Sequence, residues 1–397
     1  MNFWLTEEQE AFRKEIRQFL KAELPSDWSG VTGPTMVEFE LDRDDVWEVH
    51  KTMACKLGEK GWLALSWPAE YGGQAKSHIE HAIFSEEMAY HRSPGINTIG
   101  VEMVAPTLIV CGTEGQKEKH LRPLARGETF WCEGFSEPEA GSDLGSVRTR
   151  AVEKEDAFYI DGQKVWTTLS QRSGWCALLA RTDPEAPKHR GISFFLVDLK
   201  SPGVTINPME DASDGSELTE VFFDNVRVPK ENLVGERNQG WGVAMTLLSF
   251  ERSGAGWIGT LRRLLDDIAG YFREIVNPSE PTSKSRLIRH RLAEMAIQVE
   301  ISRLLSYRIA WMQDKGLNPE SDAALMKVYS TETMQELANI GTQLLGLYGQ
   351  LGRDLKWAPL KGVIEHCYVC TIGPKIAGGT SEVQRNVIAL RGLGLPR

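Results

Sequence analysis

The sequence has 397 residues, of which 41% are hydrophobic and 25% charged, which is typical of a globular protein with two or three packed units. The formal net charge of -10 argues against a general nucleic-acid binder, because phosphate binding needs clustered Lys and Arg side chains. The start has no basic stretch followed by an apolar run, and no apolar stretch approaches the roughly 18 residues that cross a bilayer. We therefore expect a cytoplasmic protein without a signal peptide or membrane span.

The first part of the chain, residues 1–128, has a helical pattern. Thr6 and Gln9 fit a capping box, in which each side chain satisfies a free backbone N–H at the helix start, and Pro25 ends that helix. Further helices are expected at residues 44–60, 78–91 and 102–109.

From Thr129 to about Val234 the pattern changes to short apolar runs separated by turn residues. Asp161 and Gly162 predict a hairpin turn between two of these runs, because such a turn needs positive φ. Strands are expected at residues 158–160, 164–166, 176–180, 192–197 and 221–223. Further turns are expected at Pro202 and Gly203 and at Asp224 and Asn225.

After Gly240 the chain returns to helical periodicity, with long helices expected through residues 292–305 and 323–348. The order predicts an α+β multidomain fold with three domains. These are an N-terminal helical domain (1–128), a middle β-barrel or β-sandwich domain (129–236) and a C-terminal four-helix bundle (237–397).

The six cysteines are scattered along this chain and do not suggest a disulfide framework. Cys367 and Cys370 form a C-x-x-C pair, but no second pair has the spacing of a zinc site. We expect two small residues in a helix there, and no metal site.

Residues 134–146, at the start of the β segment, closely resemble the signature of acyl-CoA dehydrogenases. The resemblance extends over essentially the whole chain, including residues 162–168, 235–241 and 379–386. It implies the three-domain fold of that family, FAD as cofactor, and dehydrogenation of an acyl-CoA thioester to the 2-enoyl-CoA.

The same resemblance assigns flavin contacts. A glycine- and serine-rich turn lets backbone N–H groups approach the ring oxygens and phosphates of a cofactor. Trp166 resembles a wall of the flavin site, although a strand Trp can equally be an ordinary core residue. Thr380 can also be a helix N-cap. The implied flavin-binding residues are Phe135, Ser136, Gly141, Ser142, Trp166, Thr168, Gln343, Gly346, Thr380 and Glu382, and Ser142 also lies near the CoA moiety.

Removing the α-proton of a thioester needs a carboxylate in a dry pocket and a polarised carbonyl. Many family members carry this base as a Glu just before the C-terminal Gly-Thr, where this chain has Gly378. Isovaleryl-CoA and long-chain members carry it instead as a Glu preceding an Arg at the start of the last domain. Glu251 and Arg252 match that place. The resemblance implies Glu251 as base, Arg252 as a CoA contact and the Gly378 N–H as a donor to the carbonyl; the alternative is an exposed charged pair.

Two departures concern the adenine end of the flavin site. The usual Arg and Phe-Gly motif is absent from residues 273–281, and Leu347 stands where a second Gly is usual. Either Arg286 or Arg289 replaces the missing Arg, or flavin binding depends on a partner chain. Bacterial members that act on sterol side chains or other bulky acids are similar here and form mixed assemblies.

The resemblance therefore implies an enzyme of lipid degradation that works as a homotetramer or heterotetramer. It would act on a branched, long or bulky acyl group and pass electrons to an electron-transfer flavoprotein. Two alternatives stay open: a subunit of a heteromeric dehydrogenase with an incomplete flavin site, and a flavin monooxygenase or oxidase on the same fold. A monooxygenase needs no base for the α-proton, so replacing Glu251 separates it from a dehydrogenase.

Overall fold

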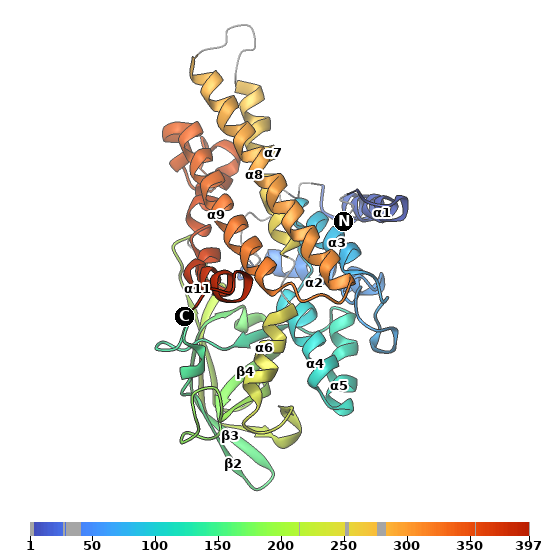
Figure 1. The fold of residues 1–397 in the computed structure, drawn as a ribbon, viewed down its shortest axis with the longest axis vertical. Coiled ribbons are helices and arrows are strands. Elements are labelled where there is room, and N and C mark those ends of the chain that lie inside the picture. Colours follow the sequence, from blue (N-terminus) through green and yellow to red (C-terminus); the bar gives the residue numbers. More distant parts are fainter. Residues whose placement is uncertain are drawn as a thin grey trace. The chain divides into compact units, whose positions relative to one another are not determined.

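The computed structural model describes residues 4–26, 28, 41–213, 215–250, 254–275, 283–353 and 355–396. Contacts divide the chain into two compact units. The first unit consists of residues 1–36, 77–93 and 252–397, and the second of residues 37–76 and 94–251. The predicted order of a helical part, a β part and a second helical part is confirmed (Figure 1).

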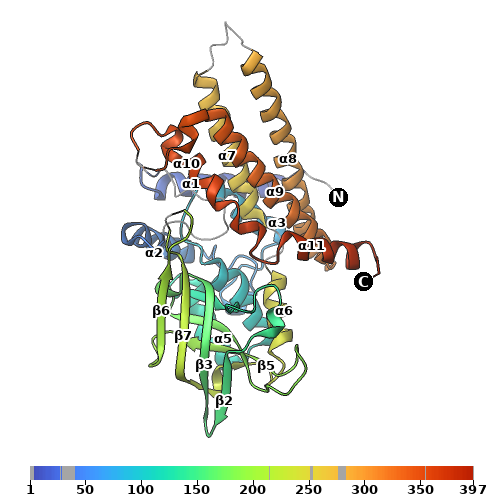
Figure 2. The same ribbon diagram turned by 90° about the vertical axis from the view of Figure 1, so that its left-hand side faces the viewer.

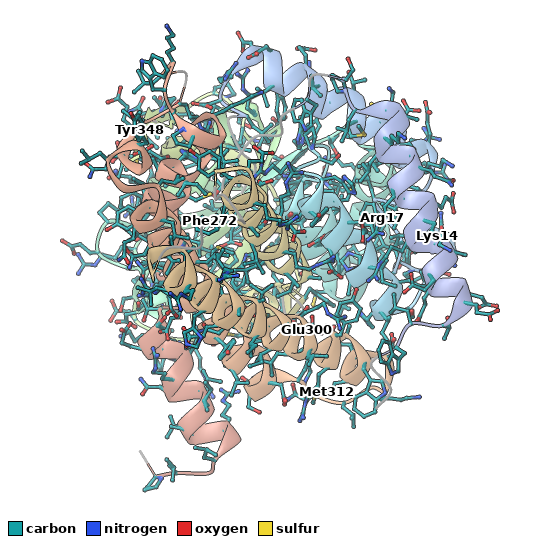
Figure 3. The ribbon with its side chains drawn as sticks, turned by 90° about the horizontal axis from the view of Figure 1, so that it is seen from above. Lys14, Arg17, Phe272, Glu300, Met312 and Tyr348 are labelled. Carbon is teal, nitrogen blue, oxygen red and sulfur yellow. The ribbon has the colours of Figure 1, made fainter. Side chains whose placement is uncertain are left out.

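The first unit is helical. Its helices are α1 (Glu7–Glu23), α3 (His78–Tyr90), α7 (Ala255–Ile275), α8 (Ser283–Asp314), α9 (Glu320–Leu345), α10 (Val363–Cys370) and α11 (Ser381–Val387). The predicted capping box is present at the start of α1, where the Gln9 N–H donates to the Thr6 hydroxyl over 3.2 Å. Figure 3 shows the side chains of these helices, with Arg17 of α1 and Phe272 of α7 among those labelled.

The core of the first unit lies between α7, α8 and α9, which run alongside one another (Figure 1). Ile258, Leu261, Leu264 and Ile268 recur every three or four residues along α7, so one face of this helix is apolar and buried. Burying this face stabilises the helix far more than the propensities of its residues could.

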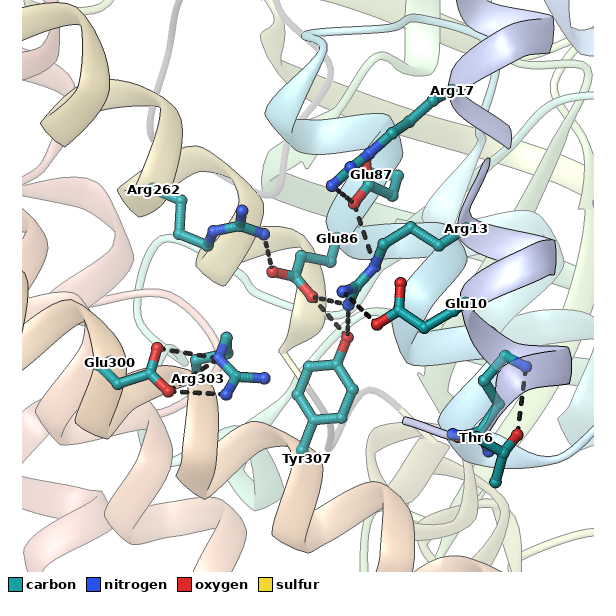
Figure 4. Close-up of polar contacts among 11 residues, drawn as sticks. Thr6, Glu10, Arg13, Arg17, Glu86, Glu87, Arg262, Glu300, Arg303 and Tyr307 are labelled. Carbon is teal, nitrogen blue, oxygen red and sulfur yellow. Dashed lines mark hydrogen bonds and ion pairs between the residues drawn. The ribbon is translucent and has the colours of Figure 1, made fainter. Parts of the chain in front are cut away.

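A buried charge network joins four helices of this unit (Figure 4). The Glu86 side chain on α3 is fully buried and forms an ion pair with Arg262 of α7. Arg13 of α1 donates to Glu86 over 3.4 Å and to the Tyr307 hydroxyl of α8 over 2.9 Å, and this hydroxyl donates to Glu86 in turn. Because a buried carboxylate is tolerated only when it is paired, Glu86 fixes how these helices pack.

The second unit contains the remaining helices and all the strands of the described residues. Its helices are α2 (Asp44–Glu59), α4 (Ala105–Cys111), α5 (Glu114–Ala125) and α6 (Gly240–Phe250). Its strands are β1 (Trp131–Gly134), β2 (Arg150–Lys154), β3 (Ala157–Thr168), β4 (Trp175–Arg181), β5 (Ile192–Asp198), β6 (Val204–Met209), β7 (Leu218–Pro229) and β8 (Leu233–Val234).

These strands form one sheet in the order β6-β7-β3-β2-β4-β5-β8, and β1 pairs with β4. Figure 2 shows β6, β7, β3 and β2 side by side. Apolar side chains from one face of the sheet, including Phe158, Ile160, Leu178, Phe195 and Val221, form its buried core. Buried residues alternate with less buried ones on either side of Asp224 and Asn225 in β7, as expected for a strand with one covered face.

The predicted hairpin at Asp161 and Gly162 is wrong. Both residues lie inside the single strand β3, at a shift of its register with β7 between Ile160 and Gly162. The predicted turn at Asp224 and Asn225 lies inside β7 on the other side of this bulge, where the Asn225 N–H donates to Asp161 over 2.9 Å. Gly162 has φ +152°, and a Cβ there would lie 2.5 Å from Oγ1 of Thr149. The glycine therefore permits a close approach of two segments rather than a change of direction.

The other predicted elements agree better with the structure. The turn at Gly203 separates β5 from β6, and the helices at 44–60, 78–91 and 323–348 match α2, α3 and α9 within a few residues. The segment predicted at 102–109 begins as a π-helix (Ile99–Val104) and continues as α4. Cys367 and Cys370 lie on α10, as expected. Among the described residues, every helix is too short or too polar to span a membrane.

Candidate active site

The signature loop that follows β1 is shaped by a tight turn. Glu137 and Ala140 exchange backbone hydrogen bonds of 3.1 and 3.0 Å, which close the turn. Phe135, just before it, is buried with its ring edge against Phe194 at a centroid distance of 6.1 Å. Gly141 and Ser142, just after it, are exposed. The loop thus anchors one aromatic residue and leaves two small residues exposed.

The carboxylate of Glu137 ties this loop to the start of β2 and to β3. It accepts hydrogen bonds from the N–H groups of Arg148 (2.6 Å) and Thr149 (2.9 Å) and pairs with the Lys164 ammonium over 2.8 Å. Burial opposes ionisation of Glu137, but the Lys164 charge and these N–H donors outweigh it and lower its pKa. The sequence pattern does not mark Glu137 or Lys164 as site residues, although both lie in segments that carry the resemblance.

Trp166 lies near the end of β3, two residues before Thr168, in an unusual conformation. Its φ is +59°, although Trp has a bulky side chain that disfavours this region, and its side chain is 58% exposed. An ordinary core residue would be buried, so the core alternative for Trp166 does not hold. Strained, exposed residues held by their surroundings cluster at ligand sites.

The segments of Phe135, Ser136 and Trp166 meet at one place in the second unit. The Val165 N–H donates to the Ser136 carbonyl over 2.9 Å, which sets the signature loop beside the strand that carries Trp166. An exposed indole, the half-buried Thr168 and Ser136, and the small residues of the loop fit a flat ring system with polar edges, such as the isoalloxazine of FAD.

The C-terminal motif lies in the first unit, at the start of α11. Thr380 is the N-cap of this helix, and its hydroxyl accepts from the Val383 N–H over 3.2 Å. The N–H of Glu382 itself and the Thr380 hydroxyl lower the pKa of the exposed Glu382 carboxyl. The N-cap reading of Thr380 is therefore confirmed, and its flavin contact remains a prediction.

The carbonyl groups of the two glycines before Thr380 accept hydrogen bonds from side chains. The Lys327 ammonium donates to the Gly379 carbonyl over 2.7 Å, and the Gln384 amide donates to the Gly378 carbonyl over 2.8 Å. Gly378 has φ +61°, and a Cβ built on it would meet no atom within 4 Å. This stretch of chain is thus fixed in a conformation that suits glycine and leaves space beside residue 378.

Gln343 and Gly346 lie at the end of α9. Arg291 of α8 donates to the Gln343 amide oxygen over 2.8 Å, and Gly346 has φ +61° and ψ -135°, which only glycine adopts readily. The next residue, Leu347, is 82% exposed. Gln343 and Gly346 therefore have a defined conformation at the end of α9, although Leu347 departs from the family motif.

Glu251 and Arg252, the proposed base and CoA contact, lie outside the described residues. They follow α6, which ends at Phe250, and α7 begins at Ala255. Leu247 on α6 is buried, and Leu248 and Phe250 are half-buried. Residues 276–281, most of the segment 273–281 that departs from the family motif, also lie outside the described residues. Arg286 and Arg289 are exposed on α8.

Comparison with known proteins gives matches along the whole chain. Three family models match in order: the acyl-CoA dehydrogenase N-terminal domain at residues 6–128, the middle domain at 132–226 and the C-terminal domain at 238–393. Acyl-CoA dehydrogenase FadE26 of Mycobacterium tuberculosis is 33% identical over 417 residues, covering 100% of this chain and 99% of that protein.

Two solved structures are similar over the full length. A steroid ACAD, Tcur3481-Tcur3483, superposes with a TM-score of 0.90 at 32% identity, covering 100% of both chains. The ChsE4-ChsE5 complex from Mycobacterium tuberculosis superposes with a TM-score of 0.89 at 30% identity, again covering 100% of both chains. The chain therefore belongs to the acyl-CoA dehydrogenase family of FAD-dependent oxidoreductases, which act on the CH–CH bond of acyl-CoA thioesters.

Proposed function

We propose that this chain removes two hydrogens from the α- and β-carbons of a bulky acyl-CoA, with Glu251 as the base that takes the α-proton. One observation carries the proposal: residue 378 is a glycine with φ +61°, so the C-terminal motif holds no carboxylate at the place where many relatives have one. The other position that carries the base in this family, at the start of the last domain, is occupied here by Glu251, directly after α6.

The surroundings of these residues suit the reaction. The helix that leads to Glu251, α6, ends in buried and half-buried side chains, and a carboxylate with little access to water is a stronger base. The backbone N–H of Gly378 would donate to the thioester carbonyl and stabilise negative charge as the α-proton leaves. Phe135, Ser136, Trp166 and Thr168 would hold FAD, which would supply the acceptor for the hydride of the β-carbon.

The remaining predicted contacts hold the ligand in place. The Arg252 guanidinium and the exposed Ser142 would bind the CoA moiety, since a guanidinium pairs well with phosphate. Gln343, Gly346, Thr380 and Glu382 would bind FAD, and Gly141 leaves room for its close approach to the loop. An electron-transfer flavoprotein would then take the electrons.

A bulky acyl group is favoured by the space beside Gly378. A Cβ there meets no atom within 4 Å, whereas a glutamate at this position would occupy that space. The steroid ACAD with a TM-score of 0.90 supports the same substrate class.

The test is the E251Q variant assayed with acyl-CoAs of increasing bulk. Glutamine keeps the shape of Glu251 but cannot take a proton, so we expect turnover to fall by about 10²- to 10⁴-fold with FAD content unchanged. The product of the wild-type protein should be lighter than the substrate by two hydrogens. As a control, D156N removes the exposed Asp156–Arg227 pair and should leave turnover unchanged. Full activity of E251Q, or a product that has gained oxygen, would contradict the proposal.

We further propose that the chain works in a mixed assembly with a second, related chain. The two solved structures reported above are two-chain proteins by name, and the flavin motif of this chain departs from the usual one at residues 273–281 and at Leu347. We expect the chain purified alone to hold less than one FAD per chain, and co-expression with a partner to raise this ratio. One FAD per chain in a homomeric particle, measured by absorbance and mass, would contradict this proposal.

A further inference from the structure

Burying the ammonium group of Lys164 costs free energy of desolvation. It lies on β3 with no exposed side-chain surface, and burial lowers the pKa of its ammonium group despite the neighbouring Glu137. Its stem runs past Gly134, where a Cβ would lie 3.5 Å from the Lys164 Cγ. An apolar side chain of similar length would fill this space without the desolvation of an ammonium group. The sheet core itself therefore does not account for a lysine here.

The ammonium and its partner instead join three segments of chain. Lys164 donates to the Phe135 carbonyl over 3.0 Å and to Glu137 over 2.8 Å. Glu137 in turn accepts from the N–H groups of Arg148 and Thr149. The pair thus links the signature loop, the entry to β2 and the middle of β3.

This link lies where the pairing of β3 with β7 is interrupted. After the bulge at Asp161, the register of β3 with β7 is regular from Gly162 to Lys164 and resumes at Thr167, so Val165 and Trp166 fall in a second irregular stretch. The Val165 N–H donates to the Ser136 carbonyl instead of to β7. The backbone that leads into the strained Trp166 is therefore held from the side of the signature loop, through Lys164 and Val165.

We propose that the Lys164–Glu137 ion pair is a positioning element for the flavin, because it holds the Trp166 segment and the Phe135–Ser136 segment in the relative placement that the ring system needs. This inference rests on the proposed flavin contacts of Phe135, Ser136 and Trp166, and it is independent of Glu251. Neither Lys164 nor Glu137 contacts the flavin in this account. Their effect passes through the backbone that they fix.

The experiment measures FAD binding and stability together in full-length K164M, E137Q and the double variant K164M/E137Q. Flavin release on dilution is followed by fluorescence, and thermal unfolding is followed with and without FAD. The single variants each leave one buried charge or polar group without its partner, so both stability and FAD affinity should fall. The double variant removes both charges, and its flavin-free unfolding temperature should recover toward that of the wild type.

The double variant decides between a positioning role and a merely structural one. We expect its dissociation constant for FAD to stay at least about tenfold above that of the wild type. The Phe135 carbonyl has lost its ammonium donor, and the single amide oxygen of Gln can replace only one of the two carboxylate oxygens that accept from Arg148 and Thr149. Wild-type FAD affinity in a folded double variant would overturn the inference. The D156N variant, at an exposed pair of the same unit, should bind FAD normally.

The W166A variant separates this inference from the assignment of the flavin site. If W166A weakens FAD binding and the double variant does not, only the positioning role of the ion pair is overturned. If W166A binds FAD as tightly as the wild type, the proposed flavin contact of Trp166 is wrong and the inference fails with it.

Discussion

Single residues in this protein are buried or strained in ways that local sequence does not reveal. Trp166 was predicted as a flavin contact from its motif, yet nothing in the motif predicts its φ of +59°. Lys164 and Glu137 lie in two segments that carry the family resemblance, one in a strand and the other in a loop. Only the fold brings their charged groups within 2.8 Å of each other and buries them. The burial of a charge depends on tertiary packing, which periodicity alone cannot predict.

Glu87 of α3 offers a test of such burial. Its side chain is fully buried, and Arg17 donates to it over 2.7 and 2.8 Å, with Arg13 at 3.3 Å (Figure 4). The His91 ring lies 3.6 Å from the same carboxylate. Burial opposes its ionisation, but the His91 ring and the two guanidinium groups outweigh it and lower the pKa of Glu87 to about 2.

The pH dependence of stability follows from this shift. Because the pKa of a glutamate in the unfolded chain is about 4.5, the unfolded state binds more protons between pH 4.5 and 2. The stabilisation by Glu87, on the order of 2–3 kcal/mol, is thus fully present above pH 4.5 and is lost as the pH falls toward 2. E87Q should unfold at a lower temperature than the wild type at pH 7, and the difference should shrink below pH 4.5.

Thermal unfolding of both proteins between pH 3 and 8 checks this expectation. E114Q is the control, because the Glu114–Lys117 pair has an exposed carboxylate and should contribute little at any pH. A difference between E87Q and the wild type that stays constant down to pH 3 would rule out the ion-pair account of Glu87.

Helices and strands were predicted well where the apolar periodicity continues over many residues. They were predicted poorly where the same residue pair is compatible with two backbone structures. The long helices α8 and α9 follow from sustained apolar spacing. An Asp-Gly pair favours a hairpin turn, but the same pair permits a bulge, and the close approach of Gly162 to Thr149 selects the bulge. The strand β1 was missed because its four residues are too short to show a pattern.

The packing of α7 on α3 depends on one of several glycines in α7. A Cβ at Gly259 would lie 2.2 Å from the Glu86 carbonyl oxygen, whereas a Cβ at Gly270 of the same helix would meet nothing within 4 Å. We expect G259A to destabilise the protein by about 1–3 kcal/mol, because the two helices must move apart. G270A should stabilise it by about 0.5–1 kcal/mol, because alanine is the better helix former.

Denaturant unfolding of the two variants, monitored by helical circular dichroism, provides the comparison. Since both substitutions add the same methyl group to the same helix, the difference between them isolates the contact with α3. Equal shifts in the same direction would show that the α3–α7 contact does not depend on Gly259.

At the scale of the whole molecule, the sequence predicted the family, the order of helical and β parts and the cofactor, because the motifs extend along the whole chain. The predicted site residues lie in two groups, and their contacts with FAD and substrate stay predictions. Trp166, Phe135 and Ser136 meet in the second unit, and Gly378, Thr380 and Glu382 meet in the first. The ion pair that holds Trp166 could not be predicted, because it joins residues 27 positions apart in the sequence through the fold of the sheet.

The proposed reaction depends most on Glu251 as the base, and anaerobic mixing with a bulky acyl-CoA tests this role most directly. Without oxygen or an external acceptor, loss of the flavin absorbance near 450 nm reports the removal of the two hydrogens alone. We predict rapid bleaching of the wild-type protein and of D156N, and bleaching slowed by at least about 100-fold in E251Q that holds the same amount of FAD. Bleaching of E251Q at the wild-type rate would contradict the account.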